Sequence, residues 1–309
     1  MDQASHVAPR ARLLGAVVDL VTCTDLLAAI ERFVGAGRKA AIGNQNLHSL
    51  YLSRRSPGMA AFYARADLIE IDSMPLVLWG KLMGLGAMRA NRCTYLDWRE
   101  RFWALASARG WRVFCLGARA GVADEAARRL MAAWPGVEIA THHGFFDATA
   151  GSPENQRVLS RINAFRPHVV LIGMGMPRQE IWVGRNLDAL QTGVALTVGA
   201  AFDYEVGLQP IAPRLYGQLS LEWLYRLAHD PRRLFRRYLI EPWTLVAPAL
   251  ADLRLYRFGT SPGGPARHLL EHPPESLNPA PSAQDLTWAT PGADRHRDEA
   301  VRGQWQPSH

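Results

Sequence analysis

Residues 169–202 read VVLIGMGMPRQEIWVGRNLDALQTGVALTVGAAF, and this stretch decides the fold. A short apolar run, VVLIGMG, precedes PRQEIWVGRNLDAL, in which Pro177 suits the first position of a helix. A second apolar run, ALTVGAAF, follows. Strand, helix and strand in this order predict two parallel strands joined by a helix that covers one face of their sheet.

The same alternation extends upstream to about residue 12. Apolar runs such as LLGAVVDLV, AAIGNQN, LIEID, WRVFCLG and VEIATHHG alternate with helix-like segments such as TDLLAAIERFVGAG, HSLYLSRRSPGMAAFYARA and GVADEAARRLMAAW. The pattern predicts an α/β core over residues 1–213: a Rossmann-like, mostly parallel sheet with helices on both faces. Ligands of such sheets bind beyond the carboxyl ends of the strands, so the residues that end each apolar run are the candidates for a functional site.

Two further regions follow the predicted core. Residues 214–257 are basic and helical in pattern, so we expect a helical appendage there. Residues 258–309 hold eight of the chain's twenty prolines, few aliphatic residues and no periodicity, which predicts a disordered tail.

Composition narrows the class of protein. The 309 residues carry a formal net charge of +7, which favours an anionic partner, but arginine patches rather than long basic tracts supply the excess and argue against nucleic acid. The three cysteines are scattered and form no C-x-x-C pair, which is typical of a reducing compartment. We expect neither a secretion signal nor a membrane-spanning helix, because every apolar run is interrupted before the roughly 20 residues that a bilayer requires.

Polar residues end two of the apolar runs. The run AAIGNQN ends in Asn44, Gln45 and Asn46, which suit either a polar ligand or the turn and cap before a helix. The run LIEID ends in Asp72, and strand alternation places Glu70 on the same side. Asp72 alone suits a general base or a helix cap, whereas the pair of carboxylates suits a metal ion.

The segments RCTYLDW and FCLGARAGVADEAARRL carry weaker signals. Arg92 is either a ligand contact or a surface charge, and Thr94 or Asp97 suits a helix cap. Gly117 and Gly121 leave room for backbone groups to approach a phosphate or a nucleobase, but their spacing does not match the G-x-G-x-x-G pattern of dinucleotide sites. An NAD site is therefore the poorer interpretation.

The helix that Pro177 begins has polar residues in its first turn. Gln179 suits contact with a polar ligand, while Glu180 complements the positive end of the helix. His142 and His143 in THHGFFD lack a third ligand at metal spacing, so we assign them to structure or substrate contact. We predict no metal and no cofactor.

A basic amphipathic helix is predicted within LEWLYRLAHDPRRLFRRYLIEPW, residues 221–243. Asp230 suits the N-cap and Pro231 the first helical position. One arc of this helix carries arginines and the other carries apolar residues: Arg232, Arg233, Arg236 and Arg237 against Leu234, Phe235, Tyr238 and Leu239. Such a helix lies on anionic lipid, grips phosphates, or packs as an ordinary surface helix.

Over residues 12–245 these segments resemble the WecG/TagA/CpsF glycosyltransferases, glycosyltransferase family 26. The resemblance rests on motifs in the family's order: Asn44-Gln45-Asn46, Asp72, RCTYLD, FCLGARAGVADEAARRL, WPGVEI, HGFFD, GMGMPRQEIW, VGAAFDYEVG, LEWLYRL and DPRRLFRRY. It implies an inverting, metal-independent hexosyltransferase that moves a sugar from a UDP-sugar to a polyprenyl-diphosphate-linked sugar during polysaccharide synthesis. It also implies a cytoplasmic protein held peripherally at the inner, anionic face of the cell membrane.

The resemblance assigns roles by motif. Asp72 resembles the family's proposed catalytic base, Asn46 its active-site asparagine and Arg92 its arginine near the substrate. Gln179 matches the glutamine of the G-x-P-x-Q-E motif. The arginines that complete the family's site over the diphosphate correspond to Arg226, Arg233 and Arg236, which we expect to matter more than Arg232 and Arg237.

Some positions depart from the family's pattern, and two other classes stay open. Asn44 stands where the family usually has threonine, and Ser73 where it has glycine. The strand and helix rhythm with its glycine turns also suits an NAD-dependent oxidoreductase, and the basic helix suits a non-catalytic membrane adaptor. An adaptor, however, would not need Asp72, Asn46 and Gln179 at separate strand ends. The donor sugar, the linkage and any homo-oligomer are left open.

Overall fold

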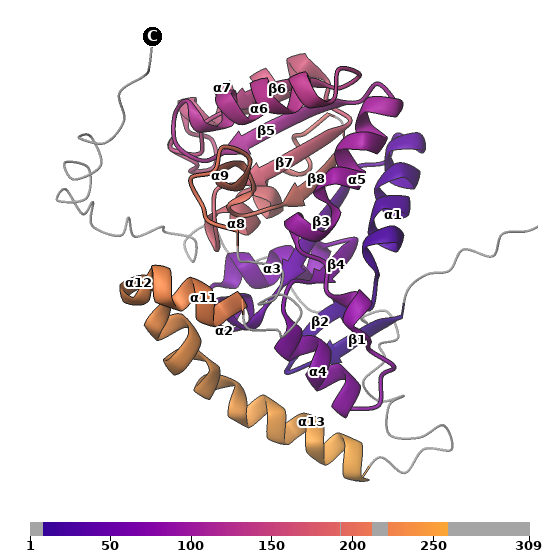
Figure 1. The fold of residues 1–309 in the computed structure, drawn as a ribbon, viewed down its shortest axis with the longest axis vertical. Helices are drawn as coiled ribbons and strands as arrows, with labels where there is room; N and C mark the ends of the chain where they lie inside the picture. Colours follow the sequence, from indigo (N-terminus) through magenta and orange to yellow (C-terminus); the bar gives the residue numbers. More distant parts are fainter. Residues whose placement is uncertain (1–8, 192, 212–221, 259–309) are drawn as a thin grey trace, which may run out of the picture. The chain divides into compact units, whose positions relative to one another are not determined.

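A parallel sheet lies at the centre of the protein (Figure 1). The computed structural model describes residues 9–191, 193–211 and 222–258, and in this part of the chain six parallel strands pair in the order β4-β3-β8-β7-β5-β6. The strands are β3 (Ala40–Gln45), β4 (Leu68–Ile71), β5 (Arg112–Gly117), β6 (Glu138–His142), β7 (Val169–Gly173) and β8 (Val194–Thr197).

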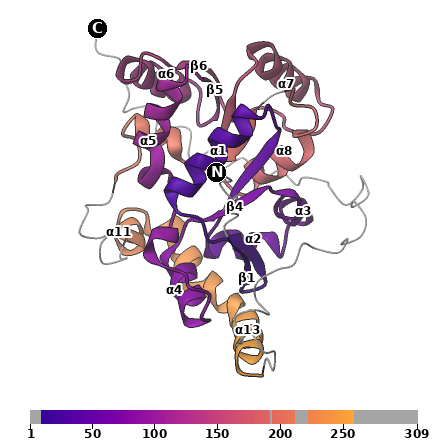
Figure 2. The ribbon, with the colours of Figure 1, turned by 90° about the vertical axis from the view of Figure 1, so that its right-hand side faces the viewer.

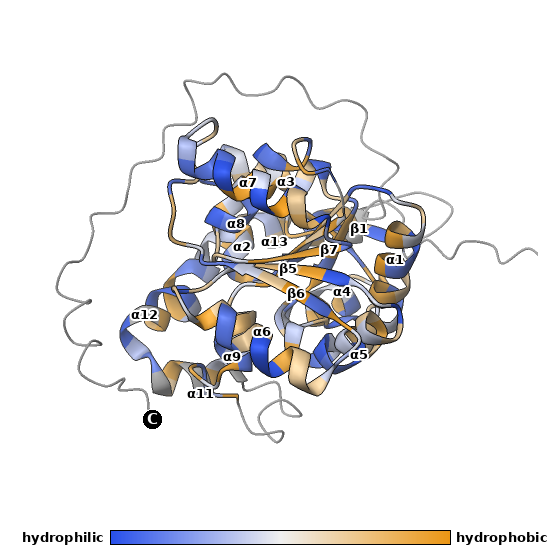
Figure 3. Ribbon diagram, turned by 90° about the horizontal axis from the view of Figure 1, so that it is seen from above, coloured by the Kyte–Doolittle hydropathy of each residue, from blue (hydrophilic) through white to orange (hydrophobic). Residues whose placement is uncertain are grey.

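Helices cover both faces of this sheet (Figure 3). In β7, Val169 and Leu171 face one hydrophobic core while Val170 and Ile172 face the other, as alternation along a strand requires. The first core is covered by α1 (Cys23–Gly35), α5 (Tyr95–Ala108), α6 (Val122–Ala133) and α9 (Ala201–Glu205). The second core is covered by α3 (Pro57–Arg65), α7 (Pro153–Phe165) and α8 (Arg178–Asn186). The fold class expected from the sequence is confirmed.

The first apolar run does not enter this sheet. It forms part of an antiparallel hairpin, β1 (Arg10–Leu13) and β2 (Ala16–Asp19), which makes a sheet of its own (Figure 2). The turn between the strands holds Leu14 and Gly15 at φ 51° and 75°, the left-handed conformation of a two-residue hairpin turn. The run was therefore two short strands, which its continuous apolar character concealed.

A second difference concerns the segment HSLYLSRRSPGMAAFYARA, which was expected to form one helix. It forms α2 (Leu47–Ser53) and α3, because the Ser56 side chain caps α3 and Pro57 occupies its first turn. Ser–Pro therefore begins a new helix in the middle of an otherwise helical pattern. Helix α2 therefore spans only the short segment between the end of β3 and this break.

Helical elements continue after residue 222. They are α11 (Glu222–His229), α12 (Pro231–Phe235), a π-helical turn η2 (Arg236–Ile240), a 3₁₀ segment η3 (Glu241–Leu245) and α13 (Val246–Phe258). A helix begins at Pro231 as predicted, but its apolar arc is not buried as a whole. Leu234 is buried, whereas Phe235 and Leu239 are 53% and 42% exposed. The wider π turn rotates each residue less than an α-helix does, so the expected faces drift apart.

Helix α13 packs beside the hairpin and α4 (Met74–Leu82), as Figures 1 and 2 show. The buried Asp252 accepts hydrogen bonds from the Leu14 backbone N–H at 2.7 Å and from Trp79 Nε1 at 2.8 Å. Leu245 of η3 belongs to the apolar cluster that the hairpin and α4 share. These contacts tie the last described helix to the core.

All described residues fall within one compact unit. The boundaries proposed at residues 213 and 257 stay a prediction, and the tail expected over residues 258–309 lies, except for Phe258, outside the described residues. None of the described helices combines the length and the apolar character needed to cross a membrane.

Candidate functional site

A cavity of about 440 Å³, the central cavity, lies beyond the carboxyl ends of β3, β4 and β8. Its walls include Asn44, Asn46, Glu70 and Asp72 from the strand ends. Further walls come from the C-terminal elements, through residues that include Leu234, Arg236, Arg237 and Glu241. The cavity lies where a parallel sheet is expected to bind its ligand, and it brings together residues from both halves of the chain.

Two neighbouring cavities share walls with the central one. A cavity of about 340 Å³, the Arg92 cavity, shares Asp72 and Arg237 with it. A cavity of about 480 Å³, the Arg178 cavity, shares Gly175 and Gly199 with it. The three form a row along the carboxyl edge of the sheet, with Asp72 between the Arg92 cavity and the central cavity.

Asp72 is held in place by Asn46. The register of β3 and β4 pairs Gln45 with Ile71, so the residues that follow them are neighbours, and Asn46 Nδ2 donates to Asp72 Oδ2 at 3.2 Å. Asn46 Oδ1 accepts from the backbone N–H groups of His48 and Ser49, both at 3.0 Å, and thereby caps α2. Asp72 does not cap α4, whose N-cap is the next residue. Asp72 therefore lines the cavity without serving as a helix cap.

Asn44 and Glu70 lie one step deeper. They are register partners on β3 and β4 and are 8% and 4% exposed. Asn44 Nδ2 donates to the Thr197 carbonyl of β8 at 3.0 Å. Burial raises the pKa of Glu70 well above its usual range, and the nearby carboxylate of Asp72 raises it further. Both effects favour the neutral form of Glu70.

Arg92 comes to the site from the loop that follows α4. The Cys93 N–H donates to the Ile71 carbonyl at 2.7 Å, which places this loop at the end of β4. Arg92 pairs with Asp97 at 3.1 Å, and Asp97 also accepts from the Thr94 N–H and hydroxyl in a capping box at the start of α5. The predicted cap is confirmed, and Arg92 lines its cavity together with Asp72.

The side-chain amide of Gln179 makes hydrogen bonds to other groups of the protein. Its Oε1 accepts from the N–H groups of Gly175 and Gly199 at 3.2 and 3.1 Å, and its Nε2 donates to Glu180 at 2.7 Å. The side chain is fully buried and lines none of the three cavities. These bonds join the loops of Gly175 and Gly199, and contact of Gln179 with a ligand stays a prediction.

Gly117 is a glycine because of packing between strands. A Cβ atom at this position would lie 2.3 Å from the Gly173 carbonyl oxygen of β7. The residue lines none of the three cavities, whereas the next two, Ala118 and Arg119, line the Arg178 cavity. Its role as a contact for a nucleobase or a phosphate stays a prediction.

His142 and His143 are placed by contacts with each other. His142 Nδ1 lies 2.8 Å from the His143 carbonyl, and its ring meets Phe146 edge to face. Neither histidine lines the three cavities. The contacts that the structure gives them are structural.

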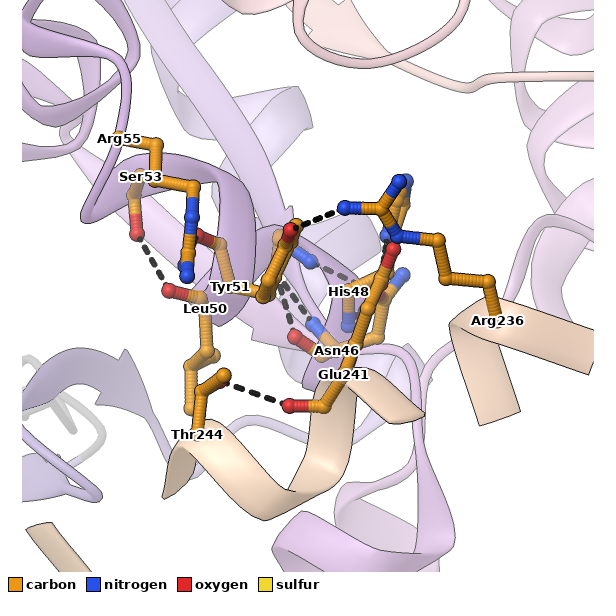
Figure 4. Close-up of polar contacts among 10 residues, drawn as sticks. Asn46, His48, Leu50, Tyr51, Ser53, Arg55, Arg236, Glu241 and Thr244 are labelled. Carbon is orange, nitrogen blue, oxygen red and sulfur yellow. Dashed lines mark hydrogen bonds and ion pairs between the residues drawn. The ribbon is translucent and has the colours of Figure 1, made fainter. Parts of the chain in front are cut away.

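The structure describes the side chains of only some of the arginines that were expected to bind the diphosphate. The side chains of Arg226 and Arg233 lie outside the described residues. Arg236 lines the central cavity, and its Nη2 donates to Tyr51 Oη of α2 at 3.2 Å (Figure 4). Arg237 lines both the central cavity and the Arg92 cavity.

Contacts that the sequence did not suggest hold these arginines over the strands. His48 Nδ1 and Glu241 Oε2 lie 2.5 Å apart, which joins α2 to η3 (Figure 4). Arg54 Nη1 donates to the Thr244 carbonyl at 3.0 Å. Because His48 and Glu241 are 193 residues apart in the sequence, no local motif could reveal the pair.

The Glycosyl transferase WecG/TagA/CpsF family model matches residues 11–258, a range that includes all residues lining the three cavities. The chain belongs to this family. Two similar proteins from Staphylococcus aureus, strains MW2 and NCTC 8325, are named N-acetylglucosaminyldiphosphoundecaprenol N-acetyl-beta-D-mannosaminyltransferase. Each is 24% identical over 245 residues, which cover 76% of this chain and 91% of the relative. The protein is therefore a glycosyltransferase, and the oxidoreductase and adaptor interpretations are set aside.

The site of this WecG/TagA/CpsF glycosyltransferase has the parts that sugar transfer needs. A carboxylate oriented by an amide suits proton removal from a hydroxyl group. Guanidinium groups that line the same cavity suit the negative charge of a phosphate. The cavity brings both kinds of group to one ligand.

Proposed function

We propose that this glycosyltransferase moves a sugar from a UDP-sugar to a sugar linked to polyprenyl diphosphate, with inversion at the anomeric carbon. The observation that supports it best is the central cavity, which Asp72, Arg236 and Arg237 line together. By their names, the Staphylococcus aureus relatives use an N-acetylglucosamine linked through diphosphate to undecaprenol. We extend an acceptor of that class to this chain.

In this mechanism Asp72 accepts a proton from the attacking hydroxyl group of the acceptor. A new bond forms from that oxygen to the anomeric carbon of the donor, and the bond from this carbon to the diphosphate oxygen breaks, so UDP leaves from the opposite face. Asn46 orients the carboxylate through its hydrogen bond. General-base catalysis of this kind contributes roughly 10²–10⁴-fold to the rate.

The departing diphosphate needs positive charge. Arg236 and Arg237 line the same cavity as Asp72, and guanidinium groups bind phosphate oxygens through two parallel hydrogen bonds. We propose that these cations stabilise the leaving group without a divalent metal ion.

Because the proposed acceptor is linked to a lipid, the enzyme must reach it at the membrane. The C-terminal elements expose large apolar side chains beside the arginines of α12 and η2: Phe235, Leu239, Ile240, Trp243, Val246 and Leu250. Exposed apolar groups beside basic ones favour peripheral binding to anionic lipid. We propose that the enzyme works on the inner face of the cell membrane, in the synthesis of a cell-surface or extracellular polysaccharide.

The test is UDP release by the full-length enzyme from a panel of UDP-sugars, with a short-chain polyprenyl-diphosphate N-acetylglucosamine as acceptor. We expect one donor to release UDP only when the acceptor is present, and to do so in EDTA. Failure of every donor would refute the proposed reaction. Activity that EDTA abolishes and Mg²⁺ or Mn²⁺ restores would refute metal independence alone and return attention to Glu70 and Asp72 as metal ligands.

A further inference from the structure

The floor of the central cavity holds polar atoms that have no protein partner. Within the described part of the chain, Asn44 Oδ1, Glu70 Oε2 and Trp98 Nε1 are buried and make no hydrogen bond. The residues are 8%, 4% and 1% exposed, and all of them line the central cavity. Leaving a buried polar atom unpaired costs about 1–3 kcal/mol, so a group of them beside a cavity indicates that a ligand supplies the missing bonds.

These atoms belong to one continuous surface. Asn44 and Glu70 are register partners on adjacent parallel strands. Trp98 comes from α5, which covers the same face of the sheet, and its indole is close enough to oppose the rise in the pKa of Glu70. The indole N–H nevertheless does not reach hydrogen-bonding geometry with the carboxyl group.

The orientation of Asn44 is fixed by its neighbour on β8. Because Nδ2 donates to the Thr197 carbonyl at 3.0 Å, the amide cannot be reversed without losing this bond. Oδ1 is thereby left as an acceptor without a partner. The surface therefore offers an amide oxygen that accepts, an indole N–H that donates, and a carboxyl group between them.

The raised pKa of Glu70 favours its neutral form, which fits this pattern. Burial raises the pKa of Glu70, and the carboxylates of Asp72 and Asp97 and the thiol of Cys23 act in the same direction. A protonated carboxyl group donates through one oxygen and accepts through the other. Sugar hydroxyl groups also donate and accept at once, whereas a phosphate only accepts, so this floor matches a sugar better than a phosphate.

We propose that Asn44, Glu70 and Trp98 form a subsite that binds hydroxyl groups of the sugar reacting at Asp72 and thereby selects that sugar. The proposal rests on the proposed function and names the part of the substrate that this chain recognises. The hydroxyl groups belong either to the donor sugar, which contains the reacting carbon, or to the acceptor sugar, whose hydroxyl group attacks that carbon. The experiment distinguishes these two sources.

Two variants remove single polar groups while preserving shape. Trp98→Phe deletes the indole N–H, and Glu70→Met deletes the carboxyl group while keeping the length of the side chain. Trp103→Phe is the matched control, because Trp103 lies on the same helix, is 1% exposed, lines none of the three cavities, and donates its N–H to a protein group, Tyr95 Oη, at 3.1 Å. Thermal unfolding of all the variants reports any general loss of stability.

The readout is the ratio of kcat/KM for a parent sugar to that for each of its deoxy analogues. In the wild type, removing the hydroxyl group that the subsite binds should lower kcat/KM about tenfold or more. In Trp98→Phe and Glu70→Met the parent substrate should lose a similar factor, and the ratio should fall towards one. Trp103→Phe should keep the wild-type ratio. A merely structural role would lower all substrates equally and leave the ratio unchanged.

The series of deoxy analogues whose kcat/KM ratio changes, donors or acceptors, identifies the sugar that carries the hydroxyl group. Deoxy donors respond if the subsite holds the donor sugar, and the dissociation constant for the UDP-sugar then rises in both variants while that for UDP stays constant. Deoxy acceptors respond if it holds the acceptor sugar. Wild-type ratios in both variants for both series would overturn the subsite and leave Glu70 and Trp98 as a buried structural pair. Failure of the wild type to release UDP from any donor would instead refute the proposed function.

Discussion

Asn46 donates a hydrogen bond to Asp72 across 3.2 Å and so joins the first residue after β3 to the first residue after β4. The other end of the same amide caps α2. One side chain therefore contributes both to the stability of a helix and to the orientation of the proposed catalytic base. This double role makes the two contributions separable by experiment.

Asp72→Asn should fold normally and lose most of its turnover. The amide keeps the size of the side chain and its contact with Asn46, but it cannot accept the proton of the attacking hydroxyl group. Turnover should fall by roughly 10²-fold or more, as loss of a general base predicts. UDP release and thermal unfolding of the purified variant check this, and wild-type turnover would remove Asp72 from the role of base.

Asn46→Ala should lose both stability and turnover. Thr22→Ala provides the comparison, because Thr22 also forms a capping box, at the start of α1, and lines none of the three cavities. Loss of either cap should lower the free energy of unfolding by about 1 kcal/mol. Only Asn46→Ala should also lower kcat. Equal kcat in the two variants would show that Asp72 needs no orientation by Asn46.

The sequence predicted the positions of helices and strands better than the contacts between residues that are distant in the sequence. Strand and helix periodicity identified the core, and Asp230 with Pro231 located the start of α12. The strand ends also located Asn44, Asn46 and Asp72 correctly, because parallel strands must bring their carboxyl ends to one edge. The residues at which strands end can be predicted from the local sequence.

Other features depend on contacts that local sequence does not carry. Gln179 stands in a motif at a helix start, yet its amide is consumed by two loops that meet only in the folded chain. The close approach of β7, which leaves no room for a Cβ atom at Gly117, likewise appears only in the folded chain. The π turn that holds Leu239 lies between α12 and η3, and η3 contacts α2 through Glu241 and His48.

Glu180 should make stability depend on pH. Burial raises the pKa of Glu180 from 4.5 to about 7, so between these values the unfolded chain loses its proton while the folded chain keeps it. The free energy of unfolding should therefore fall by about 3 kcal/mol as the pH rises from 4.5 to 7, and Glu180 should add no further dependence beyond this range.

Glu180→Gln should remove this contribution, because the amide does not ionise. Urea unfolding at pH 5 and pH 7.5 measures the difference, and the loss of stability between these values should be smaller in the variant than in the wild type. Other buried acids, such as Glu70, contribute equally to both proteins and cancel. Parallel pH profiles would show that Glu180 titrates near its usual pKa in the folded protein.

The arginines of α12 and η2 should separate into those that bind phosphate and those that bind lipid. Arg236 lines the central cavity, and Arg237 lines it together with the Arg92 cavity, so the structure adds Arg237 to the residues expected to matter most. Arg232 is exposed, lines none of the three cavities and serves as the matched control. Arg236→Ala and Arg237→Ala should lower kcat/KM on a short, detergent-soluble acceptor by more than tenfold, as loss of a charge-assisted pair predicts.

Lysine should restore little of this activity, because an ammonium group cannot offer the paired hydrogen bonds of a guanidinium group. Arg232→Ala should keep its turnover on the soluble acceptor and weaken only binding to anionic vesicles, by about 1 kcal/mol. The two assays therefore assign opposite outcomes to neighbouring arginines. Equal and mild effects at all three positions, confined to vesicle binding, would make this helix a membrane anchor and leave the diphosphate to other residues.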